Sequence, residues 1–319
     1  FGGGLNDDSI TDMADRSYND GARVWTNSWG SSGNSYTSDA DEIDAYMWAH
    51  KDFLILFAAG NDGPTSGTLD DQANAKNILA VGASENLRPH VNSQSTWNAY
   101  SMADDPYQLA YFSSRGWAED GRTKPDIVAP GSGIVSDRPS TLSDSNTGYT
   151  WIVPIDYNGD GKYDYGAMQG TSMATPVTAG CAVIVRDFYT DVEGLANPSA
   201  ALIKATIIGG AEPLPGYKYA GPDIGFGRIN IARALNPDPP LSFKYWDWQS
   251  ADTSASWSST ITVKDSSYPL RIVLVWTDAN GGANANPAIV NNLDLKVVSP
   301  SGVEYHGNIF NGDTQWSVA

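Results

Sequence analysis

The stretch Gly170-Thr171-Ser172-Met173-Ala174-Thr175-Pro176 opens an almost wholly apolar segment of helical length that runs on to Tyr189. A helix without a polar face belongs inside a sizeable core. The stretch therefore predicts a buried helix with Ser172 in its first turn. This position suits acyl transfer, because a helix N-terminus has unpaired amides and a partial positive charge that can stabilise an oxyanion. The plainer alternative is a Ser/Thr helix cap.

Segments of strand and helix character alternate along the chain before and after this helix. Residues 22–27 and 53–58 have the length and apolar character of strands, and 78–81 is another short apolar segment. Between the first two, residues 38–50 place apolar side chains at i, i+3, i+4 and i+7. Such alternation predicts βαβ units and a mostly parallel, buried sheet. We expect one α/β domain over residues 1–236.

The pattern of apolar and polar residues changes after a proline-rich linker at residues 236–240. Residues 256–264 alternate in polarity, and 270–277 form a β-branched apolar run. Turns rich in Gly, Asn and Ser separate these segments, which is typical of all-β structure. We expect a second, all-β domain over residues 241–319. It is short for a sandwich or jelly roll, so we expect it to be incomplete.

Composition excludes several classes of function. The 319 residues include 37 acidic and 19 basic side chains, which gives a net charge of −18. This balance argues against nucleic-acid and membrane partners and suits binding of hard cations such as Ca²⁺. No apolar run approaches the roughly 20 residues that span a bilayer. The single cysteine, Cys181, allows no intramolecular disulfide.

Several further motifs resemble those of the subtilases, the subtilisin-like serine proteases. The string around Ser172 is similar to the family's serine motif, and Ala58-Ala59-Gly60-Asn61 is similar to the motif with its oxyanion-binding asparagine. Three more family-like motifs are Asn27-Ser28-Trp29-Gly30, Phe112-Ser113-Ser114-Arg115-Gly116 and Lys124-Pro125-Asp126-Ile127-Val128-Ala129-Pro130-Gly131. The resemblance implies a subtilisin-like three-layer α/β fold with a mostly parallel sheet. Residues 85–89 and 290–295 resemble alkaline bacterial subtilases with a C-terminal β-barrel, which implies a partial jelly roll or β-barrel in the tail.

The resemblance also implies a serine endopeptidase site. Ser172 would be the nucleophile that forms an acyl-enzyme, and Asn61 with the Ser172 amide would hold the oxyanion. A polypeptide substrate would pair with the edge strand near Ser28. The S1 pocket would have two walls, formed by Ser28, Trp29 and Gly30 and by Ala58, Ala59 and Gly60. Residues 73–75 are a candidate floor, and these small apolar walls lead us to expect a preference for large apolar side chains.

The general base that such a serine needs is not evident. Subtilases carry Asp, then His, then Ser along the chain. None of His50, His90 and His306 stands in the glycine-rich setting of the family's histidine. Residues 1–4 resemble the stretch just beyond the missing motifs, so we expect the Asp and His on a segment upstream of residue 1. That segment would be unrecorded, cleaved off or bound as another polypeptide. A decayed pseudoenzyme is the alternative.

Two groups of oxygen-bearing side chains are candidate Ca²⁺ sites. Residues 156–164 follow the start of an EF-hand loop, but Ala167 stands where the loop needs a glutamate. Two interpretations of residues 156–164 therefore remain, a shorter calcium loop and a polar surface turn. In the tail, the resemblance points to a second cluster. The candidate ligands are Asp156, Asn158, Asp160, Lys162 and Asp164 in the first group, and Asp278, Asn292 and Asp294 in the second. Asp70-Asp71 is a weaker calcium candidate or a solvated loop.

The leading interpretation is a secreted, calcium-stabilised subtilisin-like endopeptidase whose Asp and His lie outside this sequence. The extracellular location rests mainly on the family resemblance. A catalytically inactive peptide-binding or scaffold protein on the same fold is the second interpretation. An esterase is disfavoured, because Ala174 replaces the last glycine of the Gly-x-Ser-x-Gly motif.

Overall fold

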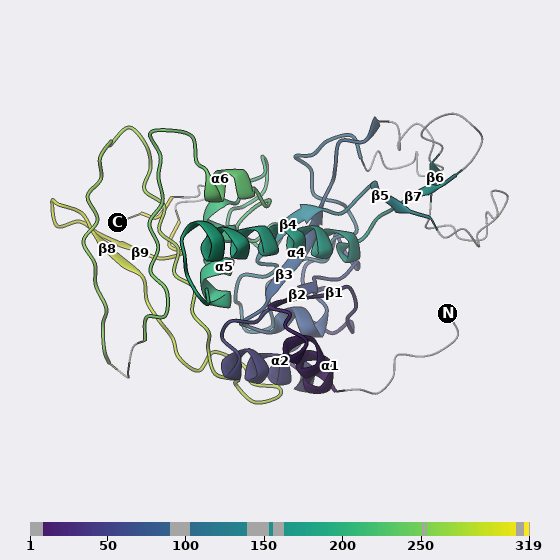
Figure 1. Ribbon diagram of the computed structural model, residues 1–319, viewed down its shortest axis with the longest axis horizontal. Coiled ribbons are helices and arrows are strands. Elements are labelled where there is room, and N and C mark those ends of the chain that lie inside the picture. Colours follow the sequence, from purple (N-terminus) through teal and green to yellow (C-terminus); the bar gives the residue numbers. More distant parts are fainter. Residues whose placement is uncertain are drawn as a thin grey trace.

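The computed structural model describes residues 9–89, 103–138, 153–155, 163–250, 252, 254–310 and 316–318 (Figure 1). Its main sheet has four parallel strands in the order β1-β2-β3-β4. Their bounds are β1 Val24–Asn27, β2 Leu54–Ala58, β3 Leu79–Ser84 and β4 Ile127–Pro130. Every residue of β2 and β3 is buried, which is why their sequences are continuous apolar runs rather than alternating ones.

Helices cover both faces of this sheet. They are α1 Ile10–Asn19, α2 Ser38–Ala49, α4 Thr171–Asp187, α5 Ala200–Gly210 and α6 Ile231–Leu235, with short turns η1 Asp71–Asn74 and η2 Phe188–Val192. Helix α4 contacts all four strands, and α5 packs against α4 and β2. In Figure 1, α4 and α5 lie on one side of the strands and α1 and α2 on the other. The predicted three-layer α/β arrangement with a parallel sheet is confirmed.

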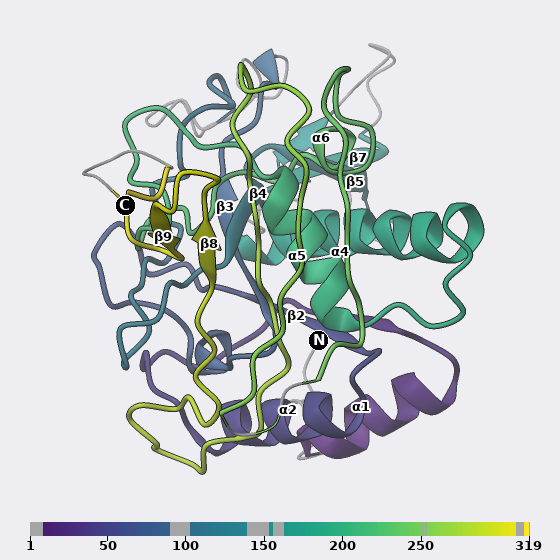
Figure 2. The ribbon, with the colours of Figure 1, turned by 90° about the vertical axis from the view of Figure 1, so that its left-hand side faces the viewer.

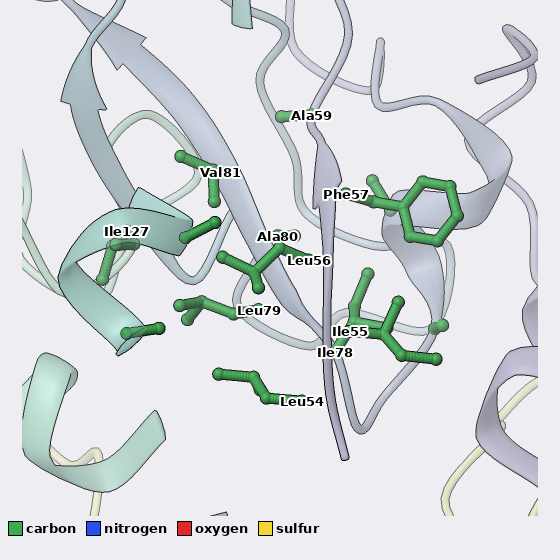
Figure 3. Packing of buried hydrophobic residues seen from close by; sticks show 14 of the residues in the cluster. Leu54, Ile55, Leu56, Phe57, Ala59, Ile78, Leu79, Ala80, Val81 and Ile127 are labelled. Carbon is green, nitrogen blue, oxygen red and sulfur yellow. The ribbon is translucent and has the colours of Figure 1, made fainter. Parts of the chain in front are cut away.

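The sheet and the helices share one large hydrophobic core. Figure 3 shows buried side chains of β2 and β3 on both faces of the sheet, with Leu56 and Leu79 on one side of β2 and Phe57 on the other. All three are fully buried. Burial of side chains of this size stabilises the fold by about 1.5–3 kcal/mol each. The core therefore holds the carboxyl ends of β1 and β2 in place, which is where the candidate site residues follow.

A buried network of charged side chains connects β3, β4 and α5. The Asp126 carboxylate, just before β4, lies 2.7 Å from Lys124 Nζ and 2.9 Å from Lys204 Nζ of α5. It also accepts a 2.7 Å hydrogen bond from the amide of Ala80 in β3. Although burial opposes it, the two lysines hold the pKa of Asp126 below its usual range. The network explains why charged side chains occur inside this core.

A small antiparallel sheet precedes the serine helix. It has the order β5-β7-β6, with bounds β5 Ile134–Asp137, β6 Val153–Ile155 and β7 Tyr165–Met168. Strand β7 ends just before Gly170, so the hairpin leads the chain into the first turn of α4. The candidate calcium loop lies between β6 and β7, and its residues 156–162 fall outside the described part of the chain.

The tail is extended and lies against the α/β part. Within its described residues the strands are β8 Lys296–Val298 and β9 Glu304–His306, which form an antiparallel hairpin. Figure 2 shows tail segments running beside α5 and past α2. In the described tail, 256–264 and 270–277 form no strand, and only Asp278 and Ala288 are buried. The predicted jelly roll or β-barrel therefore stays a prediction.

Among the described residues, none of the helices is both long enough and apolar enough to cross a bilayer.

Candidate active site

Ser172 lies in the first turn of α4, where the sequence predicted it. Gly170 occupies the N-cap with φ of 150°, a conformation that favours glycine. Its amide donates to the Gly131 carbonyl at 2.8 Å. A Cβ on Gly131 would come within 2.9 Å of the Gly170 carbonyl oxygen, so glycine allows β4 and α4 to meet closely. This junction holds Ser172 at the helix terminus, whose first amides have no partner within the helix.

A reciprocal pair of hydrogen bonds joins Ser172 to Ser28, just beyond β1. Ser28 Oγ donates to the Ser172 carbonyl at 2.8 Å, and Ser172 Oγ donates to the Ser28 carbonyl at 3.3 Å. Pro176 lies four residues after Ser172 and has no N–H, so the helix itself leaves the Ser172 carbonyl unpaired. Ser28 supplies the missing donor. The nucleophile candidate and the candidate substrate strand are therefore in direct contact.

Asn61 faces the same helix terminus from the end of β2. Its Oδ1 accepts hydrogen bonds from the Thr171 amide at 2.8 Å and from Thr171 Oγ1 at 3.1 Å. The Gly60 carbonyl is a second acceptor for the same Thr171 hydroxyl proton, at 3.2 Å from Oγ1. These bonds fix the oxygen end of the Asn61 amide, and its Nδ2 has no hydrogen-bond partner among the described residues. Asn61 Nδ2 and the Ser172 amide are therefore donors without a described partner at this helix terminus.

The two predicted walls of the S1 pocket lie side by side after the last β1–β2 pair, Asn27 with Phe57. Trp29 packs edge-on against Phe57, with ring centroids 5.2 Å apart, and its Nε1 donates to Asn27 Oδ1 at 3.2 Å. In the other wall, Ala58 and Ala59 are buried. The candidate floor, residues 73–75, lies in and just after η1 and is also buried.

Asp70 is the site residue that sequence reasoning did not assign to the pocket. Its backbone amide donates to the Ala59 carbonyl at 2.9 Å, which holds it beside the wall. Burial, and then the nearby Asp62 and Asp71, raise the pKa of Asp70 to about 6. The acidic pair at 70–71 was visible in the sequence, but no local pattern indicates that it folds back onto this wall.

Neither described histidine contacts Ser172. His50 ends α2 and packs between Tyr18 and Tyr46, with ring centroids 4.5 and 4.2 Å away. His306 lies in β9 of the tail, 4.0 Å from Glu304. His90 falls outside the described part of the chain. No general base for Ser172 is present among the described residues.

Asp278, which belongs to the tail cluster predicted to bind calcium, is hydrogen-bonded to protein groups. The Asp278 carboxylate accepts from Lys76 Nζ, from the amide of Val290 and from the amide and side chain of Asn291, at 2.8–2.9 Å. Its oxygens therefore already serve an ion pair and three amide donors, and the arrangement does not fit a calcium ligand. Asn292 and Asp294 are exposed.

Most of the first predicted calcium group falls outside the described residues, namely Asp156, Asn158, Asp160 and Lys162. Asp164 is exposed, and its carbonyl accepts from the Arg138 amide at 2.9 Å. Within the described ranges, no three or more His, Cys, Asp or Glu side chains come together in a way that could hold a metal ion.

Comparison with known proteins agrees with this architecture. A serine protease/ABC transporter B family protein of Dictyostelium discoideum, tagA, is 28% identical over 93% of this chain and 21% of its own length. Pyrolysin of Pyrococcus furiosus is 31% identical over 57% of this chain and 12% of its own length. This chain thus spans about a fifth or less of the length of these two relatives.

The fold likeness extends to solved structures. The prenylagaramide maturation protease PagA superposes with a TM-score of 0.51 at 21% identity, over 74% of this chain and 70% of its own. The sequence model of the subtilase family matches residues 2–228. Because that match runs through the edge strand, the asparagine loop and the serine helix, this chain belongs to the subtilase family.

Proposed function

We propose that the protein is a serine endopeptidase that cleaves peptide bonds through an acyl-enzyme on Ser172. One observation carries the proposal: Asn61 is anchored through its Oδ1 to Thr171, the residue before the serine. This contact leaves the Asn61 side-chain amide and the Ser172 amide as donors toward a tetrahedral oxyanion. The substrate backbone would run along residues 28–30, which extend β1 beyond its last pair with β2.

In this mechanism Ser172 Oγ attacks the scissile carbonyl carbon, and its proton passes to a histidine base. The Ser172 hydroxyl now donates weakly, at 3.3 Å, to the Ser28 carbonyl, and it would leave that partner for the base. The oxyanion that forms would accept from Asn61 Nδ2 and the Ser172 amide. Collapse of the intermediate would expel the amine, which takes the proton from the histidine. A water that the same histidine deprotonates would then attack the acyl-enzyme, release the acid and restore the Ser172 hydroxyl.

The proposal requires a histidine base and an orienting aspartate that the described residues do not supply. We place both on a segment upstream of Phe1, as the family resemblance implies. The full-length protein would then complete the triad, and residues 1–319 alone would show little or no turnover, because the three groups act as a unit.

A fluorophosphonate probe tests the proposal in the full-length protein. The probe should label Ser172, as located by mass spectrometry of the tryptic peptides. Ser172→Ala should abolish labelling, and Asn61→Ala should slow hydrolysis of a peptide substrate by about 10²–10³-fold, a magnitude that was established on subtilisin itself. Ser199 is a matched internal control, because it also begins a helix but its hydroxyl is held by Asp247 at 2.5 Å. Labelling at both serines would mean non-specific reaction and would refute an activated Ser172.

A catalytically inactive peptide-binding protein is the second candidate, and one observation favours it: no described histidine contacts Ser172. Such a protein would use residues 28–30 as a peptide-binding edge without turnover. It should bind extended peptides, as measured by fluorescence anisotropy, while the full-length protein stays unlabelled by the probe. Labelling of Ser172 would exclude it.

We also propose that residues 156–164 bind Ca²⁺, since the loop has carboxylate and amide oxygens spaced as in calcium loops. It lies just before β7 and the serine helix, so a bound ion would order the entry to the site. Calorimetric titration of the chelated protein with Ca²⁺ tests this, with Asp160→Asn as the variant. Absence of binding heat in the wild-type protein would refute it.

Two further parts of the interpretation remain proposals. We propose a jelly-roll arrangement for the tail, supported by the β8–β9 hairpin and by exposed apolar side chains such as Trp257 and Val263 that another layer would cover. Hydrogen exchange as fast as in an unfolded chain over 256–264 and 270–277 would argue against it. Secretion is supported by the family resemblance alone, and detection of the protein in culture medium tests it.

A further inference from the structure

The side chain of Asp70 lies between the two walls of the proposed S1 pocket. A Cβ on Gly60 would come 2.7 Å from Asp70 Oδ1, and a Cβ on Gly30 would overlap the same carboxylate. Gly30 and Gly60 belong to opposite walls, so one carboxylate touches both. The absence of a side chain at each glycine leaves the Asp70 oxygens as the charged groups between the walls, with Ser114 Oγ beside Asp70 at Gly60.

This carboxylate has no compensating partner among the described residues. No described cation pairs with Asp70, and no described N–H or O–H group donates to its side chain. Its acidic neighbours are partnered, because Asp62 accepts from Ser32 Oγ at 2.9 Å and Asp71 accepts from the Ser35 amide at 3.0 Å. A half-buried, unpaired carboxylate is costly unless a cation or donors approach it.

Two observations indicate which kind of cation would pair with Asp70. Asp62, Asp70 and Asp71 do not converge as a metal site, since the described residues include no group of three acids, histidines or cysteines that could hold an ion. Asp70 is also joined to the active-site wall through its backbone bond to Ala59, two residues before Asn61. A cationic side chain of a substrate bound along residues 28–30 would pair with the carboxylate if it entered between the two walls.

We propose that Asp70 makes this site selective for peptides with arginine or lysine at the residue before the cleaved bond. This inference rests on the proposed endopeptidase function and replaces the apolar preference expected from the sequence. The guanidinium or ammonium group would form a charge-assisted hydrogen bond to Asp70 between Gly30 and Gly60. The net charge of −18 would also draw cationic peptides toward the protein.

The test compares peptides that differ only at this residue, which is arginine, lysine, leucine or citrulline. Citrulline has nearly the shape of arginine but no charge, so the arginine-to-citrulline ratio of kcat/KM reports the charge contact alone. In the full-length protein we expect this ratio to be about 10–100. Asp70→Asn should bring it close to one, whatever the variant does to the absolute rate.

Asp62→Asn is the matched control, because it removes the same charge from an exposed neighbour whose carboxylate accepts from Ser32 Oγ. It should retain most of the selectivity. If it lowers the ratio as much as Asp70→Asn does, the general field of the acidic loop sets the preference and the inference is wrong. A wild-type ratio near one with active hydrolysis of the leucine peptide would also overturn it, while leaving the endopeptidase proposal intact.

Equilibrium binding separates this inference from the proposed hydrolysis. Product-like peptides that end in arginine or citrulline need no turnover to bind, and their affinities can be measured by fluorescence anisotropy. If no peptide is cleaved but arginine peptides bind more tightly in an Asp70-dependent way, hydrolysis is refuted and the Asp70 contact stands. Equal affinities for the two peptides would overturn the contact.

Discussion

At the scale of single residues, Asp70 links the proposed specificity to pH. Burial, with Asp62 and Asp71 nearby, raises the pKa of Asp70 to about 6, so the group loses its charge within a mildly acidic range. The arginine-to-citrulline ratio should therefore be largest above about pH 6 and should fall as the pH drops below it. The ratio cancels the titration of the general base, which affects both peptides alike. A ratio that stays constant from pH 7.5 to 5 would contradict the assignment.

The raised pKa of Asp70 also predicts how the stability of the fold depends on pH. The unfolded chain loses the Asp70 proton near the ordinary pKa of 3.8, while the folded state keeps it until about pH 6. The contribution of Asp70 to the free energy of unfolding is therefore largest below about pH 4. It falls as the pH rises toward 6 and stays low above pH 6. Asp70→Asn should raise the free energy of unfolding at pH 7.5 by about 1 kcal/mol, a value discounted because the carboxylate meets solvent. Denaturant titrations should find no gain at pH 3.5.

At the scale of elements, the junction between β4 and α4 determines where the serine lies. Gly131 ends the turn after β4, and its carbonyl caps the amide of Gly170. Gly131→Ala would push a methyl group against Ala83 and the Gly170 carbonyl, so we expect a loss of about 1–3 kcal/mol and slower labelling of Ser172 by the fluorophosphonate probe. Chemical denaturation and labelling rates measure the two effects.

Gly180, further along α4, is the control for this substitution. A Cβ there meets nothing within 4 Å, and alanine is a better helix former than glycine. Gly180→Ala should therefore raise stability by up to about 1 kcal/mol and leave labelling unchanged. If Gly131→Ala labels as fast as Gly180→Ala, the junction does not position the serine.

At the scale of the whole molecule, a buried ion pair attaches the tail to the α/β part. Lys76 Nζ lies 2.8 Å from Asp278, and both side chains are almost completely buried. Asn77 adds two 2.8 Å bonds, from its Nδ2 to the Asp278 carbonyl and from the Asp278 amide to its Oδ1. Although burial opposes it, the Lys76 and amide donors hold the pKa of Asp278 below its usual range. This contribution to stability is present above that range and is lost as the pH falls.

Lys76→Met would leave the Asp278 charge buried without its cationic partner, with only amide donors from Val290 and Asn291. We expect a loss of about 3–5 kcal/mol and faster proteolytic cleavage within the tail. Lys296→Met is the control, since it breaks an exposed pair with Glu304 and should change stability little. Thermal unfolding and limited proteolysis measure both. Equal effects of the two substitutions would show that the buried pair does not attach the tail.

Much of the fold could be predicted because its signals are local. The apolar runs of β2 and β3 reflect strands that are buried on both faces, and the apolar segment after Ser172 is a helix packed across the sheet. The motifs around Ser172 and Asn61 placed both residues correctly at element ends, since a turn that holds a side chain at a helix or strand terminus needs particular residues at neighbouring positions.

The sequence by itself therefore determined the α/β class and the family, and it predicted Ser172 and Asn61 as the candidate site residues. Only the tertiary structure decided which distant groups meet them. Asp70 lies against Gly30, and Asp278, predicted as a calcium ligand, pairs with Lys76. Apolar runs and periodicity are properties of a residue's near neighbours in the chain. The role of a carboxylate depends on the charges and donors that folding brings within a few ångströms, and no local pattern specifies them.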